Sequence, residues 1–321
     1  MARSKLIVIL GPTSSGKSAL AIQLARKFKG EIISADSRQV YKGMDIGTGK
    51  VSKKEQKLVL HHLLDVASPK KQFTVAHFKP LAQKAIKQIL AKKKLPFLVG
   101  GTPFYIYATI DDLQIPEVQP NLKLRSKLRS KTATELFAML KKLDPRRAKN
   151  IDRHNPHRLI RAIEIIKATG LPVPLFRHPE FISGSQDQIP KQVRNDVLIL
   201  GIQKSPEELR KLIDKRLKQR LNAGMIAEVK GLLSAKGGSA SGGKNKISHK
   251  RLQAMGLEYR FVSLYLQGKL TYNQMVEQLK HAIHKFSKRQ MTWFKTDSRI
   301  KWIKNHKQAE KLVRQYLARD N

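Results

Sequence analysis

The segment Gly11–Ser18 (GPTSSGKS) has the residue types and spacing of a loop that binds phosphate groups. Its glycines let backbone N–H groups turn toward one anion, and a helix that starts at the loop adds partial positive charge. Lys17 can neutralise a terminal phosphate, and the Ser18 hydroxyl can hold Mg²⁺ between two phosphates. We therefore predict a diphosphate or nucleotide site, with Mg²⁺ as its cofactor. Its residues are Gly11, Pro12, Thr13, Ser14, Ser15, Gly16, Lys17 and Ser18.

The segments on either side of this loop support the same interpretation. Residues 5–10 (KLIVIL) form a short apolar run rich in β-branched residues, which is typical of a buried strand. Residues 18–28 carry apolar residues at helical spacing, and Gly30 is expected to end that helix. A strand before the motif and a helix after it are the context in which the motif binds phosphate.

A second candidate residue, Asp36, follows the next predicted strand, residues 31–34. Ligands of a parallel α/β sheet bind beyond the carboxyl ends of its strands, so Asp36 should lie near the phosphate loop. There it could be a general base or an indirect Mg²⁺ partner, or it could simply cap a loop. The strand at 96–99 is followed by Gly100-Gly101-Thr102, without the acidic residue that ATPases place near Mg²⁺. The phosphate group is therefore a candidate leaving group rather than the group transferred.

The order of elements predicts an α/β fold, with a P-loop NTPase-like parallel sheet core and an α-helical insertion domain. A long amphipathic helix follows Thr74, and strand character returns at 197–202. Between these, the pattern is helical and contains prolines. We predict a core of residues 1–115 and 193–321 and an insertion domain of residues 116–192. Further helical patterns lie at 122–143, 156–169 (ended by Gly170), 205–233 and 249–293, and a flexible Gly/Ser-rich loop is predicted at 236–246.

Composition narrows the class of protein further. The 321 residues include 64 Lys and Arg but 24 Asp and Glu, a formal net charge of +40. Such a charge attracts polyanions such as nucleic acid, although a lysine-rich solvated surface would give the same count. The absence of cysteine excludes a disulfide scaffold, a thiolate nucleophile and a Cys-ligated zinc site. No apolar run is long enough for a transmembrane helix or a signal peptide, so we expect a cytoplasmic protein.

Several segments, in order along nearly the whole chain, resemble the tRNA dimethylallyltransferases, also called tRNA isopentenyltransferases. They are GPTSSGKS at 11–18, ISADSRQVYKGMDIGTGK at 33–50, VGGTPFYI at 99–106, NPHRLIRAIEIIKATG at 155–170 and KRQMTWF at 288–294. The resemblance implies transfer of a dimethylallyl group from dimethylallyl diphosphate to N6 of adenosine 37, next to the tRNA anticodon. The products would be N6-isopentenyladenosine and diphosphate.

The resemblance also implies roles for individual residues. Asp36 would be the base that removes the N6 proton, Thr13 and Lys17 would contact the diphosphate, and Arg216 would hold the leaving group. The insertion domain would bind the anticodon stem-loop, and we expect a monomer with no membrane partner. The residues implied to contact tRNA or its target adenine are Asp36, Ser37, Arg38, Gln39, Thr102, Arg125, His157, Arg158, Arg161, Lys288, Arg289, Gln290 and Trp293.

Other functions stay open on the sequence alone. The same prenyl group could be transferred to free AMP, ADP or ATP, the phosphate loop could serve a small-molecule kinase, or the chain could bind RNA without catalysis. The chain also departs from the family pattern, with Pro103, Gln253 and Leu257 where that pattern has glycine, arginine and tyrosine. These departures affect expected RNA contacts more than the chemistry.

Overall fold

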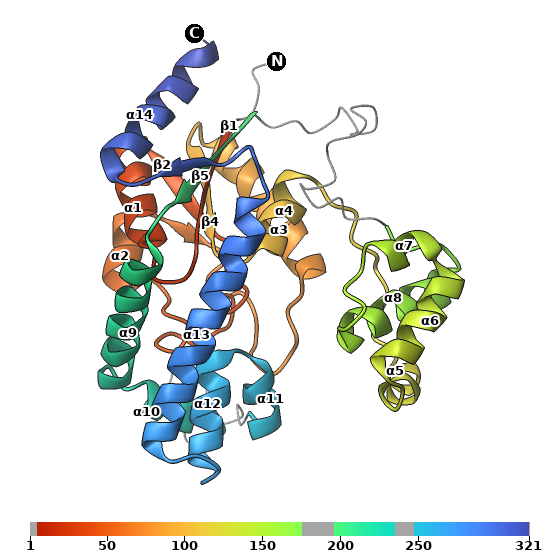
Figure 1. The fold of residues 1–321 in the computed structure, drawn as a ribbon. Coiled ribbons are helices and arrows are strands. Elements are labelled where there is room, and N and C mark those ends of the chain that lie inside the picture. Colours follow the sequence, from red (N-terminus) through yellow and green to blue (C-terminus); the bar gives the residue numbers. More distant parts are fainter. Residues whose placement is uncertain (1–4, 175–195, 235–246, 321) are drawn as a thin grey trace. The chain divides into compact units, whose positions relative to one another are not determined.

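The computed structural model of the chain describes residues 5–174, 196–234 and 247–320. It divides into two compact units: a core unit of Met1–Asp112 and Ser183–Asn321, and an insertion unit of Leu113–Ile182 (Figure 1). The sequence had placed the insertion at residues 116–192. The predicted flexible loop at 236–246 and the predicted boundary after residue 192 lie outside the described residues.

The core unit is built on a six-stranded parallel sheet with the order β3-β2-β4-β1-β5-β6. The predicted α/β fold with a parallel sheet core is thus confirmed. The central strands were visible in the sequence, whereas β3 and β6 have only 2 and 3 residues, too few to show a periodic pattern. The strands are β1 (Lys5–Leu10), β2 (Gly30–Ser34), β3 (His61–His62), β4 (Leu95–Gly100), β5 (Asp196–Ile202) and β6 (Lys301–Ile303).

Helices cover both faces of this sheet (Figure 1). Alternate residues of a strand point to opposite faces, so Leu6 and Val8 of β1 join one apolar core while Ile7 and Ile9 join another. The first core packs against α3 and α4, and the second against α1 and α14. These helices, with the short α2, are α1 (Lys17–Lys27), α2 (Lys53–Leu58), α3 (Val75–Ala91), α4 (Pro103–Ile110) and α14 (His306–Leu317), which is followed by a 3₁₀ turn at Ala318–Asp320.

A third apolar core joins helices of the C-terminal half to the loop that follows β2. Val40, Tyr41 and Met44 of that loop pack among side chains of these helices. The predicted helical stretch at 205–233 is two helices, because Gly224 adopts a left-handed conformation, with φ 94°, between them. The helices are α9 (Pro206–Asn222), α10 (Met225–Leu233), α11 (His249–Ala254), α12 (Leu257–Leu266) and α13 (Tyr272–Lys295).

Gly30 does not end the first helix as predicted. The helix α1 stops at Lys27, Lys29 makes the left-handed turn with φ 52°, and Gly30 is already the first residue of β2. A Cβ atom at Gly30 would lie 2.4 Å from the Phe97 ring on the neighbouring strand. Glycine is therefore needed here for close packing against β4 and not for the turn.

The insertion unit is a small helical domain with its own apolar core, which includes Leu136, Leu140 and Ile163. The predicted helical stretch at 122–143 is two helices, because Thr132 and Glu135 form a capping box that starts a new one. Gly170, with φ 68°, ends the last helix as predicted. The helices are α5 (Leu122–Arg129), α6 (Ala133–Leu143), α7 (Pro145–Lys149) and α8 (Pro156–Thr169).

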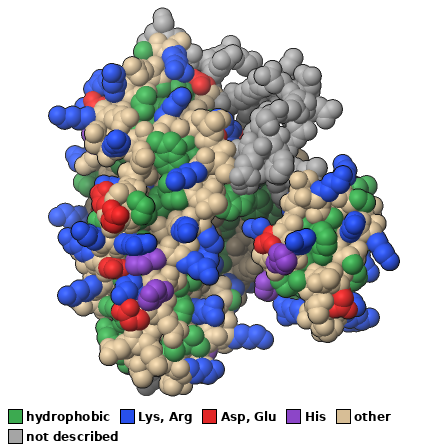
Figure 2. Space-filling view, viewed as in Figure 1, with side chains coloured by type: hydrophobic (Ala, Val, Ile, Leu, Met, Phe, Trp, Pro, Cys, Tyr) green, Lys and Arg blue, Asp and Glu red, His purple; other side chains and the backbone are tan. Residues whose placement is uncertain are grey.

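Both units carry many basic side chains. Figure 2 shows Lys and Arg over the viewed face of each unit, with fewer acidic residues between them. Within the described parts of the chain, no helix is long and apolar enough to cross a membrane.

Candidate active site

The phosphate loop joins the end of β1 to the start of α1 and folds back on itself. Ser14 and Gly16 have φ values of 62° and 91°, so the chain turns twice through the left-handed region. Lys17 Nζ donates a hydrogen bond to the carbonyl of Pro12 at 2.6 Å, across the loop. No side chain caps α1, and its first N–H groups are therefore available to an anion.

Gln290, on α13, supports this loop from a distant part of the sequence. Its Oε1 accepts a hydrogen bond from Thr13 N at 2.9 Å, and its Nε2 donates to the carbonyl of Gly101 at 2.6 Å. Its side chain is buried, so both polar atoms are used inside the protein. The resemblance implied a tRNA contact for Gln290, which stays a prediction; in the structure its side chain joins the phosphate loop to the residue that follows β4.

Asp36 follows the end of β2 and is half-buried. Its Oδ1 accepts hydrogen bonds from Arg38 N at 2.8 Å and Gln39 N at 3.3 Å, which fixes the turn after the strand. The neighbouring Ser37 N donates to Thr102 Oγ1 at 3.1 Å. Within the described part of the chain, Asp36 Oδ2 makes no hydrogen bond, so this oxygen can accept a proton.

A cavity of about 410 Å³ brings the phosphate loop, the β2 end and α9 together. Lys17, Asp36 and Arg216 all face it, although they lie far apart in the sequence. It is therefore large enough for a small ligand and has charged groups of both signs on its walls. Of the residues predicted from the sequence, it is lined by Thr13, Lys17, Ser18, Asp36, Ser37, Arg38, Gln39, Thr102, Arg216, Arg289 and Gln290.

The cations of this cavity repel one another. Burial and the nearby Arg216 lower the pKa of Lys17 to about 7, against a smaller opposing effect of Asp36. Burial and the nearby Arg220 lower the pKa of Arg216 to about 10. An anion bound between these groups would relieve both effects, because it would stabilise their charged forms.

Arg216 and Arg220 of α9 each donate to a backbone carbonyl group. Arg216 Nη2 donates to the carbonyl of Gly49 at 3.1 Å, and Arg220 Nη1 donates to that of Gly47 at 3.3 Å. Arg220 also forms an ion pair with Glu258 at 2.8 Å. A carbonyl group carries no net charge, so these contacts orient Arg216 without neutralising it.

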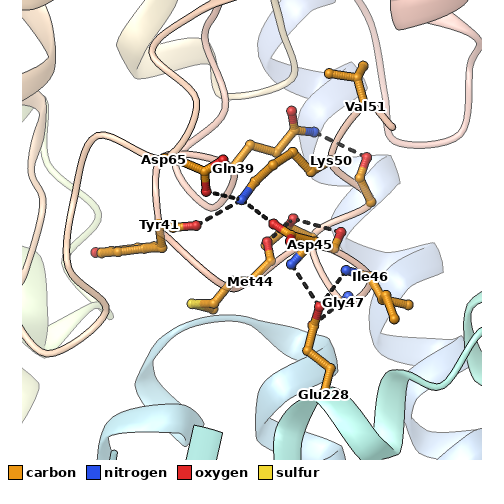
Figure 3. Close-up of polar contacts among 12 residues, drawn as sticks. Gln39, Tyr41, Met44, Asp45, Ile46, Gly47, Lys50, Val51, Asp65 and Glu228 are labelled. Atoms are coloured by element: carbon orange, nitrogen blue, oxygen red, sulfur yellow. Dashed lines mark hydrogen bonds and ion pairs between the residues drawn. The ribbon is translucent and has the colours of Figure 1, made fainter. Parts of the chain in front are cut away.

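The glycine carbonyls belong to a loop that is fixed by residues the sequence reasoning missed (Figure 3). The Glu228 carboxylate, on α10, accepts hydrogen bonds from the backbone N–H groups of Asp45, Ile46 and Gly47 at 2.8, 2.6 and 3.0 Å. Lys50 Nζ donates to the carbonyl of Tyr41. Glu228 lies 181 residues from Gly47, and its helix shows no local pattern that would single it out.

The remaining predicted residues of α13 are not all in the cavity. Lys288 lines a separate groove of about 1060 Å³ between α9 and α13, together with Lys285 and Met291. Trp293 is half-buried, and Phe294 is buried in the core against the sheet, as expected for adjacent helix residues that cannot share one face.

The predicted RNA-binding residues of the insertion unit fall into two groups. His157 and Arg158 are exposed at the start of α8. In contrast, Arg125 and Arg161 form ion pairs with the buried Glu164, at 2.7 and 2.6 Å respectively. The guanidinium groups of this second pair are therefore engaged inside the unit.

The departures from the family pattern have structural explanations. Pro103 is the first residue of α4, a position where a missing N–H costs nothing. Gln253 and Leu257 both line the cavity. They therefore change the surface offered to a ligand and not the framework that holds Lys17 and Asp36.

Comparison with known proteins gives a consistent result. The IPP transferase family model matches residues 39–297, and the isopentenyl transferase model matches residues 4–68. The tRNA dimethylallyltransferase of Carboxydothermus hydrogenoformans is 38% identical, covering 98% of this chain and 96% of its own length. That of Anoxybacillus flavithermus is 37% identical, covering 93% and 90%.

Solved structures agree with these relatives. A tRNA isopentenylpyrophosphate transferase from Bacillus halodurans superposes with a TM-score of 0.67 at 30% identity, covering 98% of this chain and 96% of that one. A eukaryotic dimethylallyltransferase described as acting on tRNA gives a TM-score of 0.74 at 26% identity, covering 98% and 77%.

Proposed function

Because the chain belongs to the IPP transferase family, we propose that it is a tRNA dimethylallyltransferase. It would transfer the dimethylallyl group of dimethylallyl diphosphate to N6 of adenosine 37, beside the tRNA anticodon. One observation of the structure carries this proposal: Lys17, Arg216 and Asp36 face one cavity of about 410 Å³. Groups that can stabilise a departing diphosphate therefore lie beside a group that can accept a proton.

The chemistry fits these groups. A bond forms between N6 of the adenine and C1 of the dimethylallyl group, while the C1–O bond breaks and its electron pair leaves with the diphosphate. Lys17, Arg216 and the N–H groups of the phosphate loop would stabilise the charge that develops on the leaving oxygen. Asp36 Oδ2 would take the N6 proton as the new bond forms.

Mg²⁺ is compatible with the residues present. Ser18 and Asp36 both line the cavity, and Mg²⁺ in phosphate sites is bound by one or two protein oxygens together with phosphate oxygens and water. Ser18 would hold the ion, which would supply positive charge to the diphosphate oxygens. Within the described residues no cluster of three His, Cys, Asp or Glu side chains exists, so the ion would depend on the diphosphate for much of its coordination.

A tRNA anticodon stem-loop is the acceptor that the charges favour. The net charge of +40 suits a polyanion, and exposed His157 and Arg158 on the insertion unit are available to RNA phosphates. The target adenine must leave its stack to enter the cavity, where Asp36–Gln39 and Thr102 line the wall. The relative of eukaryotic origin is described as acting on tRNA, which supports the same acceptor.

The test is incubation of the protein with dimethylallyl diphosphate, Mg²⁺ and unmodified tRNA, followed by mass analysis of the released nucleosides. We expect N6-isopentenyladenosine, with a yield that falls steeply as salt increases because several phosphate contacts are lost. Product from AMP, ADP or ATP but not from tRNA would instead indicate an adenylate isopentenyltransferase. ATP consumption without the prenyl donor would indicate a kinase.

A further inference from the structure

The loop formed by residues 44–50 is held from two sides by charged groups that do not line the cavity of about 410 Å³ (Figure 3). On one side, Glu228 accepts from three consecutive backbone N–H groups and from the Tyr259 hydroxyl, at 2.7 Å. On the other, Lys50 Nζ lies 2.5 Å from Asp45 Oδ1 and 2.6 Å from Asp65 Oδ1. The Lys50 side chain is only 2% exposed, whereas those of Asp45 and Asp65 are 57% and 32% exposed, so a buried ammonium group meets carboxylates at the surface.

Bonds inside the loop add to this restraint. Gly49 N donates to the carbonyl of Ile46, and Lys50 N donates to that of Asp45, both at 3.0 Å. Thr48 Oγ1 donates to the carbonyl of Met44 at 2.6 Å. Gly49 has φ 60°, and a Cβ atom there would lie 1.9 Å from Arg220 Nη2. The loop is therefore fixed in a form that lets the arginines of α9 approach its backbone closely.

The fixed loop determines the direction in which the carbonyl groups of Gly47 and Gly49 point. The carbonyl of Gly47 accepts from Arg220, and that of Gly49 accepts from Arg216. Gly47 is itself one of the three residues whose N–H groups bind Glu228. Moving the Glu228 carboxylate would therefore move a carbonyl acceptor of each guanidinium group, of which Arg220 is also held by its ion pair with Glu258.

We propose that Glu228 is a positioning residue for the diphosphate site, which acts through the 44–50 loop on Arg216 and Arg220. The physical advantage lies in the separation of charge. Glu228 contacts backbone N–H groups and not the arginines, so it orients Arg216 without cancelling the positive charge that a diphosphate needs, whereas Arg220 is already paired with Glu258. A carboxylate placed directly on Arg216 would orient it equally well but would compete with the ligand.

This inference rests on the proposed function for the identity of the ligand, but its test does not require prenyl transfer. We expect Glu228→Gln to raise the Kd of Mg²⁺–pyrophosphate, measured by calorimetry, about tenfold. The reason is that the amide NH₂ of glutamine would oppose backbone donors and disturb the loop. Glu277→Gln is the matched control, because Glu277 is an exposed glutamate on α13 that pairs with Lys280. Its Kd should not change.

A purely structural role for Glu228 is separated by a double-mutant cycle. In a background with Arg216→Gln and Arg220→Gln, Glu228→Gln should have little further effect on pyrophosphate affinity, because the groups it positions are gone. Additive effects, or an unchanged Kd in the single variant, would overturn the proposal. If Glu228→Gln fails to fold, Tyr259→Phe takes its place, because it removes one hydrogen-bond donor from the same carboxylate. The same double-mutant cycle then tests the proposal, with an expected rise in the Kd of pyrophosphate of about two- to threefold.

The two hypotheses fail in different ways. If the wild type binds pyrophosphate with this coupling but makes no isopentenyladenosine from tRNA, the positioning role stands and the proposed function falls. If the wild type makes the nucleoside but the cycle is additive, the proposed function stands and the positioning role falls.

Discussion

In the insertion unit, Arg125 and Arg161 both donate to the buried carboxylate of Glu164, whereas in the core unit Arg216 donates to the backbone carbonyl of Gly49. Burial alone would raise the pKa of Glu164, but hydrogen bonds from Arg125 and Arg161 lower it overall. The two arginines of the insertion unit thus share one buried counter-ion, whereas Arg216 is oriented by a carbonyl group that carries no net charge. The acceptor of each guanidinium group therefore distinguishes an arginine paired inside a fold from one that faces a cavity without a carboxylate partner among the described residues, a difference that Lys- and Arg-rich sequences do not show.

The largest effect tests whether Asp36 resembles Glu164, as a counter-ion, or acts as a base. Asp36→Asn keeps an oxygen that can accept from Arg38 N and Gln39 N but loses the ability to take a proton. We expect kcat to fall about a thousandfold with little change in pyrophosphate affinity. Single-turnover kinetics and calorimetry measure the two quantities. A variant with wild-type kcat would remove Asp36 from the mechanism.

Breaking the Arg125–Glu164–Arg161 cluster should lower the stability of the insertion unit and leave the diphosphate site intact. Glu164→Gln leaves two arginines without their buried partner, so we expect the insertion unit to lose about 3 kcal/mol of stability. Hydrogen exchange of the α8 amides in the full chain measures this loss. Glu117→Gln is the control, because Glu117 is an exposed glutamate of the same unit. Weaker pyrophosphate binding in Glu164→Gln would contradict the division between the two regions.

Removing Arg216 should have the reverse effect, because it should weaken use of the donor and leave the insertion unit intact. Arg216→Gln should lower kcat/KM for dimethylallyl diphosphate about a hundredfold, because a donor to the leaving group is lost. Lys215→Gln, at the exposed neighbouring position on α9, controls for the loss of one positive charge. Arg161→Gln should leave donor kinetics unchanged. Equal losses in the Arg216 and Lys215 variants would mean that only the overall field matters.

The smallest expected effect is the pH dependence of pyrophosphate binding that Lys17 causes. Lys17, with a pKa near 7 in the free protein, must be protonated to bind the anion, and binding raises its pKa. The protonated fraction falls from nearly complete at pH 6 to about a tenth at pH 8, so Lys17 alone should weaken pyrophosphate binding about tenfold over this range. Lys17→Arg stays charged throughout and reports the ionisation of the ligand itself. Parallel pH profiles of the two proteins would refute the lowered pKa.

Sequence reasoning succeeded where the chemistry is local. The phosphate loop is one continuous motif between a strand and a helix, and Asp36 follows directly from the rule that parallel strands end at the ligand-binding edge. The central strands and the Gly170 cap were predictable for the same reason, because each depends on residues within a few positions of one another. The family and the sheet fold were both confirmed.

What it missed depends on contacts between distant segments. Gln290 lies 277 residues from Thr13, and Glu228 lies 181 residues from Gly47. Gln290 was named through the family segment at 288–294, but as a tRNA contact, and Glu228 was not named at all; only the tertiary fold shows what each side chain touches. Arg125 and Arg216 also look alike in the sequence, each within a Lys- and Arg-rich helix, because the sequence does not show that Glu164 is the partner of Arg125.

The bridge that Gln290 makes between Thr13 and Gly101 has a consequence for dissecting this protein. The eight-residue motif, its strand and its helix all lie in the N-terminal third of the chain, yet the amide that fixes Thr13 comes from α13. A fragment truncated before α13 would retain the whole phosphate-loop motif and lose the two hydrogen bonds of Gln290 that support it. The recognisable motif is therefore smaller than the folded loop, because the hydrogen bond from Thr13 N is accepted by a residue 277 positions further along the chain.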